Sequence, residues 1–405
     1  MRQWNNCSQR SRRAPRSVDR VRIALVRQRY NPYGGAERFI ERALPALERS
    51  GVEVSLIARS WQSGAAGWEA RKVLLANPFY AGNLWRDISF ARAARKAWEA
   101  GNFDLVQSHE RIPGCDLYRA GDGVHAEWLD IRRAAAAPRE RFGIVLNPYH
   151  RHVCAAERQV FEHPRLRAVI CNSNMVREEI RRRFGLAPGK LHVIHNGVDL
   201  EHFHPRHRTA LRAAARAELG AAAGDILFAF VGSGFARKGL DAAIGALAGC
   251  GNAPYRLVVA GRDRYAARFA ALAAAAGLGD RVRLLGGRDD VRPLYAAADC
   301  FILPTRYDPF PNTVLEALAM GLPAIVGRRS GAAEIVRHGD NGWICEPGDV
   351  AGLTQSMHAA ARAATDDATR AAARSTAEGY GIDDMARKLI DLYGTLMAVP
   401  GGERK

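Results

Sequence analysis

The chain has 405 residues, which is large for one hydrophobic core, so we expect two α/β domains. Its 59 Lys and Arg against 42 Asp and Glu give a formal net charge of +17 at pH 7. No run of 18 apolar residues occurs, and no apolar segment follows the basic start, so neither a membrane span nor a secretory signal is expected. Seven cysteines without a Cys-x-x-Cys pair argue against a disulfide framework and suit a reducing cytoplasm.

The positive charge is concentrated in the first half of the chain. Residues 1–200 hold 34 Lys and Arg against 20 Asp and Glu, whereas residues 201–405 hold 25 against 22. The first half is therefore expected to face an anionic partner: a nucleic acid, a membrane surface or a phosphorylated acceptor. No zinc-finger, RNA-recognition or helix-turn-helix pattern occurs, so no nucleic-acid partner is predicted. We expect residues 1–20 to be a disordered basic arm or extra residues upstream of the true start.

A strand-loop-helix pattern opens the first domain. The apolar strand Val21 to Val26 leads to Gly34 and Gly35, then to a helix that ends near Ser50, and a second strand follows from Val52 to Ile57. Two glycines at the start of a helix allow a ligand to approach the backbone, and a helix N-terminus favours anions. A tight turn without a ligand is the alternative interpretation.

The next strand, Asp104 to Gln107, leads into a polar stretch that includes Asp122 and His125. From Trp128 to Phe161 the chain becomes basic and aromatic, and prolines interrupt any strict helical period. Apolar anchors flanked by cations are attracted to an anionic bilayer surface. We therefore expect membrane contact here; a solvated, partly packed excursion of the first domain is the alternative.

Histidines and acids elsewhere do not form a metal-binding pattern. After a strand from Ala168 to Cys171 and a basic helix from Met175 to Phe184, five histidines lie between His192 and His207, but their spacing is irregular. Asp289 and Asp290 are better interpreted as the cap and first turn of a helix ending at Ala298. No Asp-x-Asp motif follows a strand, so the chemistry is predicted to be independent of metal.

The second domain is predicted to begin after an alanine-rich linker or helix, Thr209 to Ala223, with a strand from Ile226 to Val231. Gly232 and Gly234 follow, but the third glycine of a Gly-x-Gly-x-x-Gly motif is absent, so this match is weak. Arg237 and Lys238 come next, at the mouth of a helix, where a guanidinium fork and a point charge can hold a diphosphate. A surface pair of cations without a ligand is the alternative.

Two acids follow the buried strand predicted from Cys300 to Leu303. Asp308 lies on a proline-broken loop, and Glu316 lies in an apolar-periodic helix that Asn312 or Thr313 could cap. Ligands of open α/β sheets bind beyond the carboxyl ends of the strands. The two carboxylates are therefore placed to accept hydrogen bonds from a polyhydroxylated ligand. The chain after Val350 is predicted to be helical.

Several of these motifs resemble one family. The segment from Pro304 to Pro323 resembles the Glu-x7-Glu signature of the retaining GT4 glycosyltransferases, with Asp308 in place of the first Glu. Residues 237–241 and 196–205 are similar to two further motifs of that family. The resemblance implies a GT-B fold: two doubly wound Rossmann-like domains, 21–205 and 206–380, facing each other across a cleft. Residues 381–405 would form a helix crossing back to the first domain, and a tail.

The resemblance also implies roles for individual residues. A nucleotide sugar, expected to be UDP-glucose, would serve as co-substrate without a metal or other cofactor. Gly34, Gly35, Arg237 and Lys238 would hold its diphosphate, which leaves in the reaction. Asp308 would accept hydrogen bonds from the sugar hydroxyls, and Glu316 from the ribose.

Residues 113–122 narrow the family further. Their Pro-Gly-x-Asp-x-Tyr and Ala-x-Asp motifs resemble the heptose-directed glucosyltransferases of the lipopolysaccharide core. The resemblance to that branch implies that Asp122 is the acid beside the acceptor hydroxyl, and His125 is the second candidate for this position. An Asp-Gly turn without a catalytic role is the alternative. The expected acceptor is a lipid-linked saccharide, and the enzyme would be peripheral on the inner face of the cytoplasmic membrane. Another surface-glycan glycosyltransferase, a GT-B sugar-nucleotide epimerase and an inactive scaffold remain alternatives.

Overall fold

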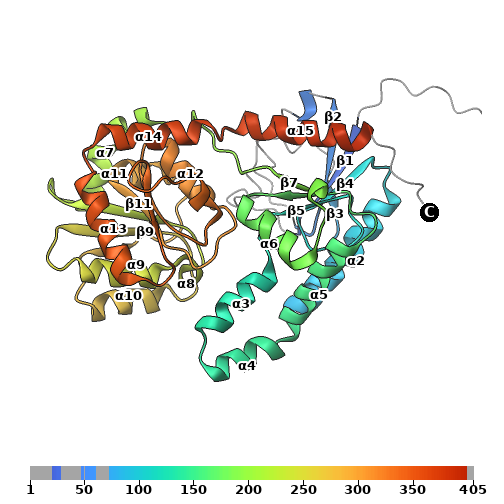
Figure 1. Cartoon of the computed structure of the whole chain (residues 1–405), viewed down its shortest axis with the longest axis horizontal. Coiled ribbons are helices and arrows are strands. Elements are labelled where there is room, and N and C mark those ends of the chain that lie inside the picture. Colours follow the sequence, from blue (N-terminus) through green and yellow to red (C-terminus); the bar gives the residue numbers. More distant parts are fainter. Residues whose placement is uncertain (1–20, 29–46, 50, 61–72, 399–405) are drawn as a thin grey trace, which may run out of the picture.

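Two parallel β-sheets, one in each half of the chain, organise the computed structural model (Figure 1). It describes residues 21–28, 47–49, 51–60 and 73–398. The predicted pair of doubly wound Rossmann-like domains is confirmed. The expectations for the basic arm at residues 1–20, for Gly34 and Gly35, and for the tail after residue 398 lie outside the described residues.

The first sheet has the strand order β3-β2-β1-β4-β5-β6-β7. All of its described strand pairs are parallel, and strands buried on both faces are typically continuous apolar runs. The order reverses at β1, next to β4, and ligands of doubly wound sheets bind beside this reversal. The strands are Val21–Val26 (β1), Val52–Ala58 (β2), Val73–Leu75 (β3), Leu105–Ser108 (β4), Leu117–Ala120 (β5), Ala168–Cys171 (β6) and Leu191–Val193 (β7).

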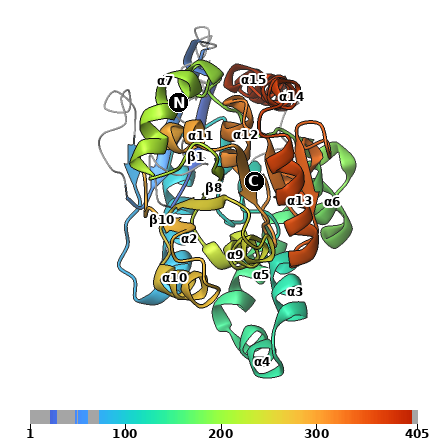
Figure 2. The same cartoon turned by 90° about the vertical axis from the view of Figure 1, so that its left-hand side faces the viewer.

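Helices follow the strands of the first lobe: Gly82–Ala100 (α2), His125–Ala135 (α3), Pro138–Leu146 (α4), Pro148–Glu162 (α5), Asn174–Phe184 (α6) and the short 3₁₀ turn Pro188–Lys190 (η1). The basic and aromatic segment is thus three helices. Pro138 and Pro148 stand at the first positions of α4 and α5, where a missing N–H costs no hydrogen bond. Figures 1 and 2 show α3 and α4 projecting away from both sheets as an arm.

The second sheet repeats the topology of the first, with the order β10-β9-β8-β11-β12-β13. Its strands are Ile226–Val231 (β8), Tyr255–Ala260 (β9), Val282–Leu284 (β10), Cys300–Leu303 (β11), Ala324–Gly327 (β12) and Gly342–Cys345 (β13). The strand order reverses between β8 and β11. Lys238, at the end of the short helix after β8, and Asp308, on the loop after β11, are therefore neighbours at one edge of the sheet.

The helices of the second lobe are Pro205–Glu218 (α7), Phe235–Lys238 (α8), Leu240–Gly249 (α9), Ala266–Ala275 (α10), Arg292–Ala297 (α11), Asn312–Ala319 (α12), Val350–Arg362 (α13) and Asp367–Glu378 (α14), with a 3₁₀ turn at Gly331–Glu334 (η2). The alanine-rich segment is therefore mostly helix. Helix α7, which contains most of this segment, starts at Pro205. Arg208 and Arg212 of α7 donate hydrogen bonds to the Ala298 carbonyl oxygen at the end of α11.

Two sequence-based expectations about helix starts were wrong. Neither Asn312 nor Thr313 caps α12: the helix begins at Asn312, and the residue before it is Pro311, whose side chain has no acceptor. The Asn312 side-chain oxygen instead accepts a hydrogen bond from Asn196 Nδ2 at 2.5 Å, which joins the two lobes. The acids at 289 and 290 precede α11, and the Asp290 carboxylate accepts from the Arg292 amide at 2.9 Å.

The last helix, Ile382–Ala398 (α15), returns to the first lobe (Figure 1). Met385, Leu389 and Tyr393 on its apolar face are buried in one cluster with residues of β1 and β2. The Tyr393 hydroxyl donates to Gln107 Oε1 at 2.7 Å, so a buried polar contact fixes the register of this helix on the sheet. None of the described helices is long and apolar enough to cross a membrane.

Candidate active site

A buried ion pair between Lys238 and Asp308 lies at the centre of the candidate site. Lys238 ends the one-turn helix α8 after β8, and Asp308 lies on the loop between β11 and α12. The Lys238 ammonium is hydrogen-bonded to Asp308 Oδ2, and both residues are more than nine-tenths buried. Two sequence segments 70 residues apart thus meet at one point.

Gly239 permits this approach. Its φ of +79° lies in the left-handed region that favours glycine. A Cβ added there would lie 2.2 Å from the Pro304 carbonyl oxygen, so any side chain would push α8 away from the loop that carries Asp308. The glycine of the Arg-Lys-Gly segment is therefore required by packing.

Arg237 completes the cation pair. Its Nη1 donates to the Tyr307 carbonyl oxygen at 3.1 Å and lies 3.6 Å from Asp308 Oδ2. Burial lowers the pKa of Lys238 below its ordinary value; the Asp308 carboxylate opposes this shift, and Arg237 adds to it. One carboxylate thus faces two cations, and the cluster keeps an excess of positive charge.

Glu316 lies in the adjoining cavity of the second lobe. It is a buried residue of α12, and its Oε2 accepts a hydrogen bond from the Tyr295 hydroxyl at 3.2 Å. The cavity has a volume of about 300 Å³, and its walls include Gly232 and Gly261, the glycines that directly follow β8 and β9. A Cβ on Gly232 would lie 3.3 Å from Lys238 Cε, so the Lys238 side chain lies next to this wall of the cavity.

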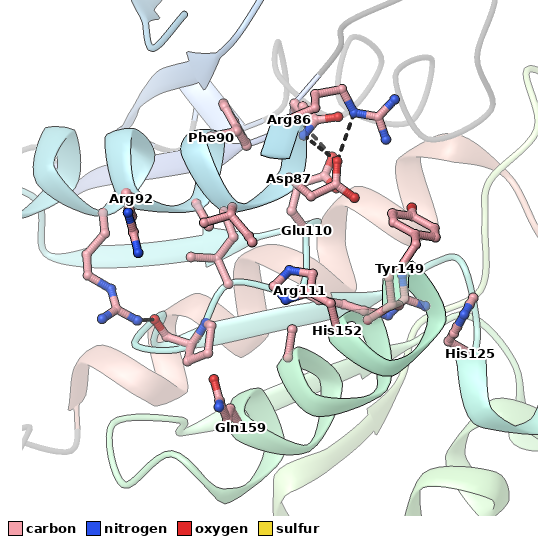
Figure 3. Close-up of a pocket in the computed structure, with 18 of the residues that line it drawn as sticks. Arg86, Asp87, Phe90, Arg92, Glu110, Arg111, His125, Tyr149, His152 and Gln159 are labelled. Atoms are coloured by element: carbon pink, nitrogen blue, oxygen red, sulfur yellow. Dashed lines mark hydrogen bonds and ion pairs between the residues drawn. The ribbon is translucent and has the colours of Figure 1, made fainter. Parts of the chain in front are cut away.

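In the first lobe, Asp122 and His125 line a second cavity of about 360 Å³ between α2 and α5 (Figure 3). The Asp122 carboxylate lies 3.9 Å from Arg27 Nη1, and its side chain is 57% exposed. His125 Nε2 lies 3.1 Å from His150 Nδ1. Burial first, and nearby Arg111 second, lower the pKa of His125 to about 3, so its ring is neutral at physiological pH.

Tyr307 brings the two halves of the site together. Its hydroxyl donates to Glu179 Oε2 at 2.7 Å and accepts from the Val124 amide at 2.9 Å, and its ring stacks on Trp128 with a centroid distance of 6.3 Å. Tyr307 directly precedes Asp308, and Val124 lies two residues after Asp122. The Asp122 turn of the first lobe is therefore held against the loop of the second lobe that carries Asp308.

The turn itself depends on Gly123. Its φ is +69°, and an added Cβ would lie 2.4 Å from the Tyr307 hydroxyl. A larger residue at 123 would push Tyr307 away. The Asp-Gly sequence that suggested an ordinary turn is thus part of the contact between the lobes.

Sequence reasoning missed the residues that support this arrangement. Glu157 is buried on α5 and accepts from Arg111 Nε and from the His125 amide, both at 3.0 Å. These partners are 46 and 32 residues away along the chain, and no local pattern links them. Tyr307 lies inside the recognised signature, where its position between Arg306 and Asp308 was the one available signal.

The described residues of the site include no group of metal ligands. In the ranges that the structure covers, no set of three or more His, Cys, Asp or Glu side chains is placed to hold a metal ion. The histidines between 192 and 207 have separate surroundings: His195, for example, pairs with Glu334, and His204 accepts from the Arg206 amide. Independence of metal remains a prediction.

Two Rossmann-like lobes that contact each other beside a buried cation–carboxylate cluster fit the class of GT-B glycosyltransferases. Two family models agree with this class: "Glycosyltransferase Family 4" matches residues 33–202, and "Glycosyl transferases group 1" matches residues 212–377. These matches correspond to the two lobes.

Individual proteins resemble the chain over most of its length. The lipopolysaccharide glucosyltransferase WaaG of Escherichia coli K12 is 26% identical over 329 residues, covering 80% of this chain and 85% of the relative. A crystal structure of WaaG, a glycosyltransferase involved in lipopolysaccharide biosynthesis, has a TM-score of 0.80 at 23% identity and covers 91% of this chain and 99% of that one. HepE of Anabaena in complex with UDP-glucose has a TM-score of 0.69 at 19% identity, covering 92% and 99%.

The chain therefore belongs to the family 4 glycosyltransferases with the GT-B fold. It is a glycosyltransferase, as its motifs predicted.

Proposed function

We propose that this glycosyltransferase transfers glucose from UDP-glucose to a glycolipid acceptor such as the lipopolysaccharide core, with retention of configuration. The observation that carries the proposal is the Lys238–Asp308 pair, placed between the cavity of Glu316 and the Asp122 turn of the other lobe. The similarity to WaaG supports the acceptor class, and the shared fold with HepE bound to UDP-glucose supports the donor.

The second lobe would bind the donor. Glu316 would accept from the ribose hydroxyls, since it is buried in the cavity wall and already oriented by Tyr295. Both contacts of Asp308 with Arg237 and Lys238 use its Oδ2. Its Oδ1 therefore remains available to accept from a hydroxyl of the transferred sugar, and the cations hold the carboxylate in one orientation.

Charge stabilisation would provide most of the catalysis. As the sugar–phosphate bond breaks, negative charge grows on the departing diphosphate, and Arg237 and Lys238 would stabilise it. Preorganised donors in a site shielded from water are effective because they need no reorganisation during the reaction. Asp122 would accept a hydrogen bond from the acceptor hydroxyl that attacks the sugar. No pair of carboxylates flanking the bond is assigned, unlike in glycosidases.

The arm formed by α3 and α4 would contact the membrane. Three large apolar side chains near its tip are exposed: Phe142 by 67%, Leu146 by 54% and Val145 by 50%. Arg139 and Arg141 on the same helix are also exposed. Apolar residues that enter the headgroup region beside cations bind an anionic bilayer surface. A lipid-linked acceptor would then reach the first-lobe cavity from the inner face of the cytoplasmic membrane.

Liposome sedimentation tests the arm. We expect the protein to sediment with vesicles containing anionic lipid at low salt, and we expect Phe142→Ser with Leu146→Ser to reduce the bound fraction several-fold. Val350, 38% exposed on the second lobe, provides the control Val350→Ser, which should bind like the wild type. Equal binding of the arm variant, or equal binding to neutral vesicles, would contradict this role.

A donor panel tests the function. We expect UDP-glucose to raise the melting temperature more than other nucleotide sugars, and Glu316→Ala to weaken this donor at least tenfold in titration calorimetry, because a buried charged hydrogen bond is lost. Transfer of glucose to a truncated lipopolysaccharide core completes the test. Tight UDP-glucose binding with donor turnover in the absence of any acceptor would point instead to an epimerase.

A further inference from the structure

The first-lobe cavity extends well beyond Asp122 and His125. Its walls are helices α2 and α5 and the loop after β4. Figure 3 shows His125 and Tyr149 at one end of the cavity, and Arg92 and Gln159 at the other. Asp87 and Arg95 both line it from α2, eight residues and thus about 12 Å apart along the helix axis. The cavity is therefore long enough to hold more than the sugar that accepts the transfer.

The charged groups near the reacting end are paired with one another. The Arg86 side chain bonds the Asp87 carboxylate at 2.8 Å, and Arg111 bonds Glu157 at 3.0 Å. The Glu110 carboxylate lies 3.4 Å from Arg27 Nη1 and accepts from the Gln28 amide. These pairs leave little net charge at this end of the cavity.

The far end differs because its cations have no acidic partner in the described part of the chain. Arg95 donates to the Pro113 carbonyl oxygen, which fixes its guanidinium, but it forms no ion pair with a carboxylate of the described residues. Arg92 lies one helical turn before Arg95 and is exposed at the rim, without a hydrogen bond or ion pair to a described residue. Both arginines line the same cavity, opposite Gln159 of α5.

Apolar side chains surround these cations. Phe90, Ile112 and Val153 belong to the same walls, so an anion held there would be partly removed from water. A guanidinium presents two parallel N–H groups that match the oxygens of a phosphate or a carboxylate, and such charge-assisted bonds strengthen in a low dielectric. This end of the cavity therefore suits an oxyanion, because it offers the two arginine charges, the Gln159 amide and apolar walls that exclude part of the water.

We propose that the Arg92–Arg95 end of this cavity binds an oxyanionic substituent, a phosphate monoester or a carboxylate, carried by the acceptor saccharide at a distance from the hydroxyl that reacts. The proposal rests on the proposed function, since it assigns the acceptor to this cavity. It adds that the acceptor is an anionic saccharide, recognised by its charge as well as by its sugar rings. Part of the excess positive charge of the first lobe would then serve to bind the acceptor.

Binding of simple sugars tests this subsite without a transfer assay. The probes are glucose 6-phosphate, glucuronate and unmodified glucose, titrated in the presence of saturating UDP so that phosphate does not bind in the other lobe. We expect at least one charged probe to bind the wild type and glucose not to bind measurably. Arg92→Gln and Arg95→Gln should each lower the affinity for that probe at least tenfold. The charged probe that binds the wild type more tightly identifies the oxyanion.

Arg158→Gln is the matched control. Arg158 lies on α5 and is exposed, but it does not line the cavity, so its variant loses the same charge and should bind the probe like the wild type. Equal affinity in all variants, or no binding of either charged probe, would overturn the subsite. Affinity for UDP-glucose is measured on the same proteins. If the wild type does not bind UDP-glucose, the donor proposal fails, while a selective effect of Arg92 and Arg95 still supports the subsite.

Discussion

Replacing Lys238 by alanine is expected to lower kcat for glucosyl transfer by a factor on the order of 10²–10³. Lys238 is the buried cation of the cluster, and the diphosphate would take the place beside it as the glycosidic bond breaks. Because the interaction strengthens as charge develops, kcat should fall more than the affinity for UDP-glucose. Initial rates at saturating donor and acceptor measure this effect directly.

Loss of folding must be separated from loss of chemistry in this variant. Removing Lys238 leaves the buried Asp308 carboxylate with only Arg237 Nη1, 3.6 Å away, as its cation, and a buried charge that has lost its closest partner destabilises a protein. The double variant Lys238→Ala, Asp308→Asn removes that charge and should melt at a higher temperature than the single variant while remaining inactive. Lys96→Ala, an exposed substitution on α2, should leave both stability and rate unchanged. Full activity of a folded Lys238→Ala would remove this residue from the leaving-group site.

The second large effect concerns the dependence of stability on pH. Burial raises the pKa of Glu179 to about 7, and the hydrogen bond from Tyr307 opposes this shift. Between about pH 4.5 and pH 7 the folded protein therefore keeps a proton on Glu179 that the unfolded chain releases. The contribution of this group to the free energy of unfolding is highest below about pH 4.5 and decreases as the pH rises to about 7. Glu179→Gln stays neutral and can still accept from Tyr307. We expect the free energy of unfolding of this variant to equal that of the wild type at about pH 4.5. At about pH 8 it should be larger than that of the wild type by up to about 3 kcal/mol.

Urea unfolding at several pH values measures this difference. The neighbouring Glu178 provides the control, because its hydrogen bond with Arg181 lowers its pKa. Glu178→Gln should therefore change the pH dependence in the opposite direction, with the wild type losing its advantage as the pH falls. Identical pH profiles for Glu179→Gln and the wild type would mean that this carboxyl is ionised in the folded protein.

The fold and the proximity of the candidate residues in the second lobe could be predicted because their signals are local. A continuous apolar run such as Cys300 to Leu303 is typical of a parallel strand buried on both faces, and the proline break after it marks the ligand-binding edge. The Arg-Lys-Gly segment follows β8, and the two acids follow the adjacent strand β11, Asp308 on the loop and Glu316 in the helix after it. Strand order in a doubly wound sheet therefore brings Lys238 and Asp308 together without further information.

The supporting contacts depend on tertiary packing and could not be predicted. Tyr307 and Glu179 are 128 residues apart, and only the docking of one lobe on the other makes them partners. The start of α12 was misjudged for the same reason: Asn312 is a good capping residue in isolation, but in the folded protein its side chain contacts Asn196 of the other lobe. At the contact between the lobes, tertiary packing thus outweighed the preference of asparagine for the capping position.

A structure of the protein with a slowly reacting donor, UDP-2-deoxy-2-fluoroglucose, tests the central claim most directly. We predict that the diphosphate oxygens lie about 3 Å from the side-chain nitrogens of Arg237 and Lys238, with the ribose hydroxyls on Glu316 and the sugar between Asp308 and Asp122. A donor bound with its diphosphate away from both cations would contradict the account.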